Sequence, residues 1–187
     1  NKYIPKDKFI VMHAGSVGIT NALDTLLNSA KKIENSIQDI HFLIIGEGDL
    51  ISKYKLQYSS LSNLTFAPRV QKDMVQEILG YADLLYFSAF KSIVWKYGQS
   101  LNKIIDYMYS GKPIVGSYSG YPSMINEAKC GNFIKPEDDE ILINEIVKFY
   151  KKDLNELNKI GQRGKQWLLS HRTYDVLAEN YLKIIYD

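Results

Sequence analysis

The stretch YGQSLNKIIDYMYSGKPIVG, residues 97–116, decides the fold of this sequence. Its apolar residues recur at helical spacing up to Gly-Lys-Pro, and a short apolar run follows at once, so it predicts a helix joined to a buried strand. The expected buried stripe of the helix follows the i, i+3, i+4, i+7 pattern and comprises Leu101, Ile104, Ile105 and Met108. The start of this helix is polar, which a purely structural helix does not require, and this favours a helix that faces a ligand.

The rest of the chain repeats the alternation of strand and helix. Buried strands are predicted at 9–15, 41–48, 63–68, 83–89, 113–117 and 131–135. Helices are predicted at 21–33, 72–82, 153–169 and 174–186, and another is opened by Pro136 and an acidic first turn. Such alternation indicates parallel βαβ units, and strands that are apolar almost throughout indicate helices on both faces. We therefore expect an α/β fold with a doubly wound parallel sheet of about six strands.

Composition limits the class of protein. The 187 residues are enough for a single domain, 1–187, and their 45% hydrophobic and 24% charged content is typical of a soluble globular protein. A net charge of +2 gives no reason to expect a nucleic-acid partner. The single cysteine, Cys130, cannot form an internal disulfide, so we expect a reducing, cytoplasmic compartment.

The sequence as given predicts neither a membrane span nor a signal peptide. No apolar run reaches the ~18 residues of a membrane span, and residues 1–8 lack the apolar core of a signal peptide. Because the first residue is not Met, we expect the sequence to be a piece of a longer chain.

Ligands bind parallel sheets at the carboxyl ends of the strands, so the residues that follow each strand matter most. After the first strand, Gly15, Ser16 and Gly18 are expected to bring backbone amides close to a phosphate; a tight strand-to-helix turn is the alternative. The glycine spacing there does not match the dinucleotide-binding fingerprint. His13, within this strand, is expected to pack as a strand side chain or to point at the edge of the cleft.

Two further turns follow the next strands. In GEGDL, residues 46–50, Glu47 or Asp49 is expected to cap the next helix. In APRVQKDM, residues 67–74, Arg69 and Val70 stand at a strand end, where exposed backbone can pair with the edge of a nucleotide base. An ordinary surface arginine is the alternative interpretation.

The richest candidate site is the start of the helix quoted above. Ser100 is a plausible N-cap, and the amides of Gly98, Gln99 and Ser100 together with the Lys103 ammonium suit a diphosphate. Glycine at position 98 allows the backbone to approach a ligand closely. Asp106 lies three residues after Lys103, and its carboxylate can accept two hydrogen bonds from a ribose diol. The alternative is a surface Lys–Asp pair on one helix face.

Aromatic and apolar residues mark two more candidate surfaces. The aromatics of YFSAFKSIVWKY, residues 86–97, are expected to be exposed, with Trp95 foremost; a buried Trp95 is the alternative. The last predicted helix carries Val176, Leu177, Leu182 and Ile185, and we expect these to give it an exposed apolar surface on the cleft side.

The quoted stretch, preceded by PRVQKDMVQEILGYADLLYF, resembles the carboxyl-terminal domain of GT-B glycosyltransferases of family 4, especially members that build bacterial capsule, O-antigen and other surface polysaccharides. FIVMHAGSVGITNALDTLLNSAKKI and FLIIGEGDLISKYK fit the first two strand–helix units of the same domain, so the resemblance covers about residues 7–186. It implies that this Rossmann-like half binds a nucleotide-sugar donor, usually a UDP-sugar. The acceptor would be bound by an amino-terminal domain that this sequence lacks. The aromatics at 86–97 would then shape the sugar pocket or dock that other domain.

By position, Asp106 stands where the family has the second Glu of its E-x7-E motif, which binds the ribose. The first Glu, which contacts the donor sugar, is replaced by Gly98. Some polysaccharide-forming members also lack it and read Gly-x-Ser-Pro-Asn-Lys; here Leu101 replaces the Pro, and Lys103 matches a lysine that faces the diphosphate.

After the first strand this sequence also departs from the family, since Ser16, Val17 and Asn21 stand in the region of its usual Arg and Lys. The resemblance implies a retaining transfer of a hexosyl or N-acetylhexosaminyl group, with Lys103 as the catalytic residue that stabilises the departing diphosphate, and with no metal and no cofactor. An isolated domain is expected to bind donor weakly and to transfer little. The full-length enzyme is expected in the cytoplasm, in peripheral contact with the inner membrane.

Other classes fit less well. A nucleotide-sugar 2-epimerase has a similar two-domain architecture, and a non-catalytic interaction domain stays open. A phospho-acceptor receiver domain matches GKPIV, residues 111–115, but it requires acidic residues where the first strand here ends in HAGS. A dinucleotide-dependent oxidoreductase lacks its glycine fingerprint. No Asp, His and Cys cluster has the spacing of metal ligands.

Overall fold

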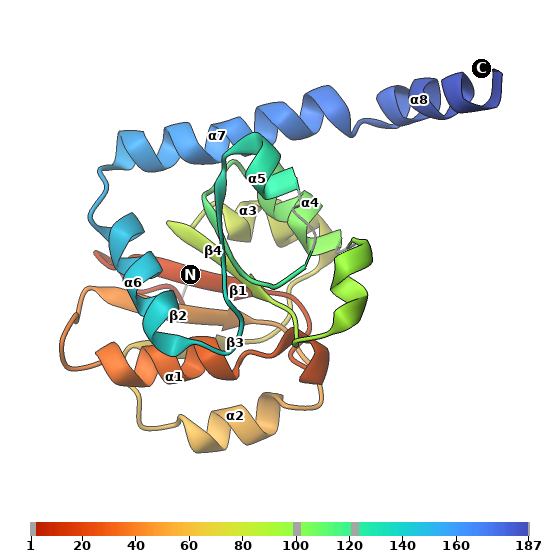
Figure 1. Ribbon diagram of the computed structural model, residues 1–187. Coiled ribbons are helices and arrows are strands. Elements are labelled where there is room, and N and C mark those ends of the chain that lie inside the picture. The colour runs from red at the N-terminus through yellow and green to blue at the C-terminus, as the bar shows by residue number, and fades with distance from the viewer. Residues whose placement is uncertain (1–2, 99–101, 121–123, 187) are drawn as a thin grey trace.

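The computed structural model describes residues 3–98, 102–120 and 124–186 of the chain (Figure 1). Within these ranges six strands form one parallel sheet in the order β3-β2-β1-β4-β5-β6. The strands are β1 Phe9–Ala14, β2 Ile40–Ile45, β3 Leu64–Ala67, β4 Leu84–Ser88, β5 Ile114–Ser117 and β6 Gly131–Ile134. The predicted doubly wound parallel sheet is therefore confirmed. The strand order reverses between β1 and β4, which is where such sheets open a crevice for ligands.

Both faces of the sheet are covered, which explains why the strands read as apolar runs. All six residues of β2 are buried. Along β1, Val11 faces one hydrophobic cluster, whereas Ile10 and Met12 face the other, as the two-residue period of a strand requires. The register pairs Phe9 with Ile40 and continues without a break to the end of both strands.

Eight helices lie in the described part of the chain: α1 Asp24–Ile33, α2 Ile51–Gln57, α3 Val75–Leu79, α4 Asn102–Tyr109, α5 Met124–Ala128, α6 Asp139–Tyr150, α7 Leu154–His171 and α8 Tyr174–Tyr186. Three short 3-10 turns, Ile19–Asn21, Lys72–Met74 and Ile93–Tyr97, precede α1, α3 and α4. The buried side chains of α1, α2 and α6 belong to one cluster, and those of α3, α4 and α5 to the other. The layered arrangement around the sheet can be followed in Figure 1.

Several predicted element boundaries were wrong. The helix expected at 21–33 begins at Asp24, after a 3-10 turn, and the one expected at 72–82 divides into a 3-10 turn and α3. The first turn of α6 is capped by Asp138, whose Oδ1 accepts from the Ile141 amide at 3.0 Å, so Pro136 lies outside that helix. Neither predicted acidic cap serves α2, whose N-cap position is Leu50 and has no side-chain cap bond.

The buried stripe of α4 also differs from the prediction. Ile104 and Met108 are buried, but Ile105 is 39% exposed and Tyr107 takes its place in the core. The Tyr107 hydroxyl accepts from the Ala14 amide at 2.8 Å and donates to the Ala14 carbonyl at 3.0 Å. These bonds tie α4 to the end of β1, which an apolar side chain could not do. Leu101, the fourth predicted member, lies outside the described residues.

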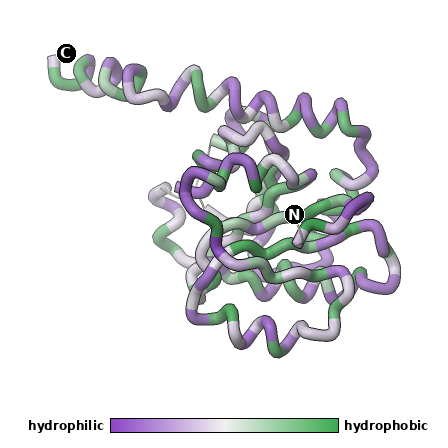
Figure 2. Tube along the Cα trace, turned by 180° about the vertical axis from the view of Figure 1, so that it is seen from behind, coloured by the Kyte–Doolittle hydropathy of each residue, from purple (hydrophilic) through white to green (hydrophobic). Residues whose placement is uncertain are grey.

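The last two helices differ in what they contact. Helix α7 approaches the body closely at Gly161, where an added Cβ would lie 1.9 Å from the Gly111 carbonyl oxygen. Helix α8 projects away from the body in Figure 1, and no residue of it is buried. Figure 2 shows apolar and polar residues mixed along it. As predicted, Leu177, Leu182 and Ile185 are exposed, whereas Val176 is half-buried. None of the described helices is long and apolar enough to span a membrane.

Candidate functional site

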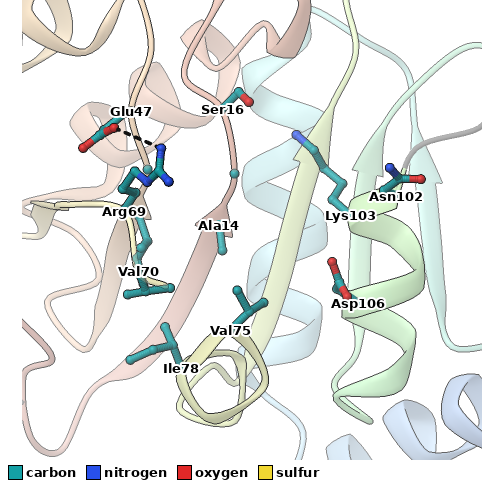
Figure 3. A pocket seen from close by; sticks show the side chains of 13 residues that line it. Ala14, Ser16, Glu47, Arg69, Val70, Val75, Ile78, Asn102, Lys103 and Asp106 are labelled. Carbon is teal, nitrogen blue, oxygen red and sulfur yellow. Dashed lines mark ion pairs between the residues drawn. The ribbon is translucent and has the colours of Figure 1, made fainter. Parts of the chain in front are cut away.

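A pocket of about 480 Å³ opens at the carboxyl ends of β1, β2 and β3, against the first turns of α4 (Figure 3). It lies beside the point where the strand order reverses. Its lining comes from five segments of the chain and comprises Ala14, Gly15, Ser16, Ile45, Gly46, Glu47, Arg69, Val70, Val75, Ile78, Asn102, Lys103 and Asp106. Residues far apart in sequence therefore meet at the edge where a parallel sheet places its ligands.

The wall formed by the turns after β1 and β2 is made of backbone. Gly15 and Gly46 have φ values of 152° and 151°, a region that side chains rarely allow. An added Cβ at Gly46 would lie 1.8 Å from the Gly15 carbonyl oxygen, so the two turns touch directly. The Gly15 amide donates to the Ile45 carbonyl at 2.9 Å and the Val17 amide to the Glu47 carbonyl at 2.9 Å.

These bonds correct one expectation. The Gly15 amide cannot reach a phosphate, because the β1–β2 ladder continues past the strand and uses it. By contrast, the Ser16 amide donates no hydrogen bond to any of the described residues. The role of Gly15 is different: because it has no side chain, the Lys103 ammonium can lie directly over this turn.

Lys103 forms the cationic part of the opposite wall. Its ammonium donates a hydrogen bond to Oδ1 of Asn21 in the Ile19–Asn21 turn. It also lies over Gly15, since an added Cβ there would be 3.3 Å from its Nζ. No carboxylate of the described residues forms an ion pair with it. Burial disfavours the charged form and lowers the pKa of Lys103 to about 8.

Asp106 stands one turn further along α4 and is exposed. Figure 3 shows it reaching toward the pocket from the same helix as Lys103. Partial desolvation raises the pKa of this carboxyl, and the positive charge of Lys72 opposes that rise. Its carbonyl oxygen accepts from Gln76 Nε2 at 3.2 Å, while its carboxylate has no hydrogen-bond partner in the described chain. A carboxylate in this position can accept from a ligand diol.

The far side of the pocket, next to β3, is mixed in character. Arg69 is 73% exposed at its side chain and pairs with Glu47, with Nη1 3.8 Å from Oε2. Val70, Val75 and Ile78 supply apolar surface below this pair. Sequence reasoning missed Val75 and Ile78 as lining residues, although their i, i+3 spacing marks one face of a helix.

His13 lies beneath the first turn and not in the pocket. It is fully buried, and burial together with the nearby Lys103 charge lowers its pKa to about 3. Its Nδ1 and Nε2 lie 3.3 Å from the carbonyl oxygens of Tyr86 and Ser16, respectively. A neutral imidazole carries one N–H, so one of these carbonyls accepts from it. This confirms the expectation of a packed strand side chain.

The predicted aromatic surface at 86–97 was wrong for its first members. Tyr86 and Phe87 are fully buried, because they belong to β4 in the middle of the sheet. Trp95 packs edge-on against Phe90 and Tyr118, with ring centroids 6.0 and 5.9 Å away. Its Nε1 donates to the Phe90 carbonyl at 2.8 Å. Tyr97 remains 90% exposed.

The structure thus brings together six of the predicted site residues, namely Gly15, Ser16, Arg69, Val70, Lys103 and Asp106. Gly98 ends the Ile93–Tyr97 turn with φ 109° and is not among the lining residues. Gln99 and Ser100 lie outside the described residues. Within the described ranges, no group of three His, Cys, Asp or Glu side chains is placed to hold a metal ion.

Solved structures share this fold along nearly the whole chain. Against a variant of S. aureus TarM in complex with fondaparinux, alpha-GlcNAc-glycerol and UDP, the TM-score is 0.78 at 19% identity, covering 98% of this chain and 37% of that one. Against WaaG, a glycosyltransferase involved in lipopolysaccharide biosynthesis, it is 0.73 at 18% identity, covering 95% and 47%. Against the C-terminal domain of the group 1 glycosyl transferase LpcC from Francisella tularensis, it is 0.72 at 15% identity, covering 92% and 90%.

The lengths are informative, because this chain spans about a third to a half of TarM and WaaG but matches nearly all of the LpcC domain. No curated protein matches the sequence significantly. The family model described as "Glycosyl transferases group 1" matches residues 8–152, from β1 to just beyond α6. The chain, with its parallel sheet and its pocket at the strand ends, therefore belongs to the group 1 glycosyl transferases.

Proposed function

We propose that this chain is the donor-binding domain of a retaining glycosyltransferase that uses a UDP-sugar. The observation that carries the proposal is the pocket in which the Lys103 ammonium and the Asp106 carboxylate stand one helical turn apart over a backbone-lined turn. A diphosphate needs positive charge and free amides, whereas a ribose needs an acceptor for its diol. The presence of UDP in the TarM complex supports the choice of nucleotide.

In this proposal the nucleotide lies across the pocket. The ribose contacts Asp106, the base lies toward the backbone of Arg69 and Val70, and the diphosphate lies between Lys103 and the Ser16 amide. Negative charge grows on the diphosphate as the glycosidic bond to the sugar breaks, and Lys103 stabilises that charge. The amides of Gly98, Gln99 and Ser100, which the sequence predicts to face the diphosphate, would add to this stabilisation; Gln99 and Ser100 lie outside the described residues.

The acceptor side belongs to a larger protein. We propose that an amino-terminal domain binds a polysaccharide or lipid-linked acceptor, and that the transferred group is a hexosyl or N-acetylhexosaminyl unit. The short coverage of TarM and WaaG supports a second domain, and the lipopolysaccharide role of WaaG supports a bacterial surface polysaccharide such as capsule as the product. The exposed apolar residues of α8 are then a contact for that domain.

A cytoplasmic enzyme in peripheral contact with the inner membrane fits a lipid-linked acceptor. This chain alone, which lacks an acceptor site in the proposal, is expected to transfer little sugar. Transfer by the 187-residue chain at the rate of a complete enzyme would contradict the division of labour proposed here.

Calorimetric titration of the chain with UDP, uridine and inorganic diphosphate tests the donor site. UDP is expected to bind more tightly than either fragment, since it alone engages Lys103 and Asp106 together. Titration with GDP and ADP then tests the base. Equal binding of UDP and uridine would contradict a diphosphate site, and tighter binding of a purine nucleotide would contradict the choice of UDP.

A further inference from the structure

We propose that Asn21 is a positioning residue for the donor site: its side-chain carbonyl holds the Lys103 ammonium over the Gly15 turn without neutralising it, so that the whole positive charge is left for the diphosphate. This inference rests on the proposed function, since it assigns a purpose to the charge of Lys103. Asn21 itself contacts no ligand in this scheme, and it acts only through Lys103.

The contact joins two elements that are 82 positions apart in sequence. The Lys103 side chain leaves α4 and crosses toward the 3-10 turn after β1, where its ammonium donates to Asn21 Oδ1. A lysine side chain has several rotatable bonds, and fixing them costs free energy that one directed hydrogen bond partly offsets. Without the Asn21 carbonyl, the ammonium would have no side-chain acceptor among the described residues.

The turn that carries Asn21 is held firmly from the sheet. The Ser88 hydroxyl, at the end of β4 and buried, donates to the backbone carbonyl of Asn21 and lies 3.2 Å from that of Ala22. The Phe90 amide donates to the Thr20 carbonyl at 3.3 Å. Ala22 closes the turn with φ 42°. The backbone of Asn21 is therefore fixed by the sheet, and this fixes the place from which its side-chain carbonyl reaches Lys103.

The charges that face Lys103 explain why a neutral acceptor matters. His13 from β1 is neutral at physiological pH, and Glu47 is paired with Arg69 across the pocket. Asp106, on the same helix as Lys103, forms no ion pair with it in the described chain. Burial brings the pKa of Lys103 to about 8, close to physiological pH, so losing a hydrogen bond to the ammonium would lower the charged fraction of Lys103 at that pH. A carboxylate at position 21 would keep the lysine charged but would cancel that charge toward a diphosphate.

The first experiment measures the Lys103 pKa without any ligand. The chain is labelled with an amine-reactive reagent from about pH 6 to about pH 10, and the labelled Lys103 peptide is quantified by mass spectrometry. For the parent chain the midpoint is expected at about 8. Asn21→Leu is expected to lower it by roughly one to two pH units, because a hydrogen bond to the charged form is lost. Asn21→Asp is expected to raise it by a similar amount, because an opposite charge is added.

The second experiment measures binding of UDP and uridine at about pH 8. Both Asn21 variants are expected to lose roughly tenfold or more in UDP affinity and to keep their uridine affinity. Thr20→Val, a change at an exposed neighbour in the same turn, is the matched control and is expected to alter neither ligand. Circular dichroism melting confirms that each variant folds, and Asn21→Asp retains the shape of the native side chain.

The two experiments separate the failure of this inference from that of the proposed function. If Asn21→Leu and Asn21→Asp leave the Lys103 midpoint unchanged, or move it in the same direction, Asn21 does not control the lysine and the inference is overturned. If the midpoints move in opposite directions but UDP does not bind even the parent chain, the contact is real and the proposed donor site is wrong. Opposite midpoint shifts with a joint loss of UDP affinity support both.

Discussion

The two long walls of the pocket are built in different ways. The wall at the ends of β1 and β2 consists of backbone, where Gly15 and Gly46 touch and where no side chain fits at Gly46. The wall on α4 consists of the side chains of Asn102, Lys103 and Asp106. The first wall is inseparable from the sheet, because the same amides continue the ladder between β1 and β2. The second could change its chemistry while the helix stays in place.

This difference predicts which substitutions affect folding and which affect binding. Changes in the backbone wall should lower the free energy of unfolding, since they force apart turns that the sheet holds together. Changes in the side-chain wall should lower ligand affinity and leave stability nearly unchanged. Measuring both quantities for each variant tests the distinction.

The largest effect is expected for Gly46→Ala. The new methyl group would overlap the Gly15 carbonyl oxygen, 1.8 Å away, and would need the unfavourable φ of 151°. We expect a loss of more than about 3 kcal/mol in the free energy of unfolding, or a failure to fold. Chemical denaturation measures it, and Gly18→Ala, where an added Cβ meets nothing within 4 Å, is the control. Similar stability of the two variants would show that the turns after β1 and β2 can move apart without cost, which would contradict this prediction.

Acid should weaken the backbone wall through His13. The pKa of His13 is lowered from 6.5 to about 3 by burial, so in this pH range the unfolded chain binds a proton that the folded chain does not. Its contribution to stability is complete above pH 6.5 and is lost as pH falls toward about 3, by up to about 1.4 kcal/mol per pH unit.

The comparison uses unfolding free energies of the parent chain and of His13→Gln across this pH range. The variant is expected to be less stable at neutral pH, and the gap should close on acidification. Thr20→Val, an exposed change that removes no titratable group, should show no such convergence. A constant gap between the parent and His13→Gln would mean that His13 is not held neutral in the fold.

In the side-chain wall, Lys103→Met should weaken binding of UDP without lowering the free energy of unfolding. The substitution removes a charge-assisted contact worth roughly 1.5–3 kcal/mol. The affinity for UDP should therefore fall about tenfold to hundredfold, and the affinity for uridine should stay unchanged. Stability should stay level or rise, because burial disfavours the ammonium in the folded state. Calorimetry measures the affinities and chemical denaturation measures the free energy of unfolding. Lys53→Met, which replaces an exposed lysine, is the control. Equal weakening of UDP and uridine would remove Lys103 from the diphosphate site.

Asp106→Ala should reduce affinity less than Lys103→Met does, and it should reduce the affinity for UDP and for uridine alike. UDP and uridine carry the same ribose, so we expect both to weaken about fivefold to tenfold, through loss of an acceptor that remains partly solvated. Deoxyuridine nucleotides, which lack one hydroxyl of the diol, should be less sensitive to this change. Unchanged UDP affinity would make Asp106 a structural surface acid.

The smallest effect is expected for Arg69→Gln. The guanidinium is exposed, and its pair with Glu47 at 3.8 Å is a surface ion pair, worth about 0.2–1 kcal/mol at most. The proposed contact to the base uses the backbone of Arg69, which the substitution keeps. We expect less than about a threefold change in UDP affinity and no change in melting temperature. A loss comparable to that of Lys103→Met would assign the diphosphate to Arg69 instead.

The sequence predicted the parts of this protein that depend on local pattern. The six apolar runs and the helices between them follow from periodicity, and they imply a parallel sheet with its ligands at the carboxyl ends. Lys103 and Asp106 come to the pocket together because both lie near the start of one helix. For the same reason Val75 and Ile78 were open to prediction but were overlooked.

Tertiary structure alone decided what depends on pairing between distant segments. The Gly15 amide donates to the Ile45 carbonyl and so is not available to a ligand. Tyr107 takes the place of Ile105 in the core because its hydroxyl forms hydrogen bonds with the end of β1. The hydrogen bond between Lys103 and Asn21 spans 82 positions and leaves no periodic trace in either segment. Periodicity reports which face of an element is buried, whereas the partner of a particular polar atom is set by strand order and by the turns that the sheet brings side by side.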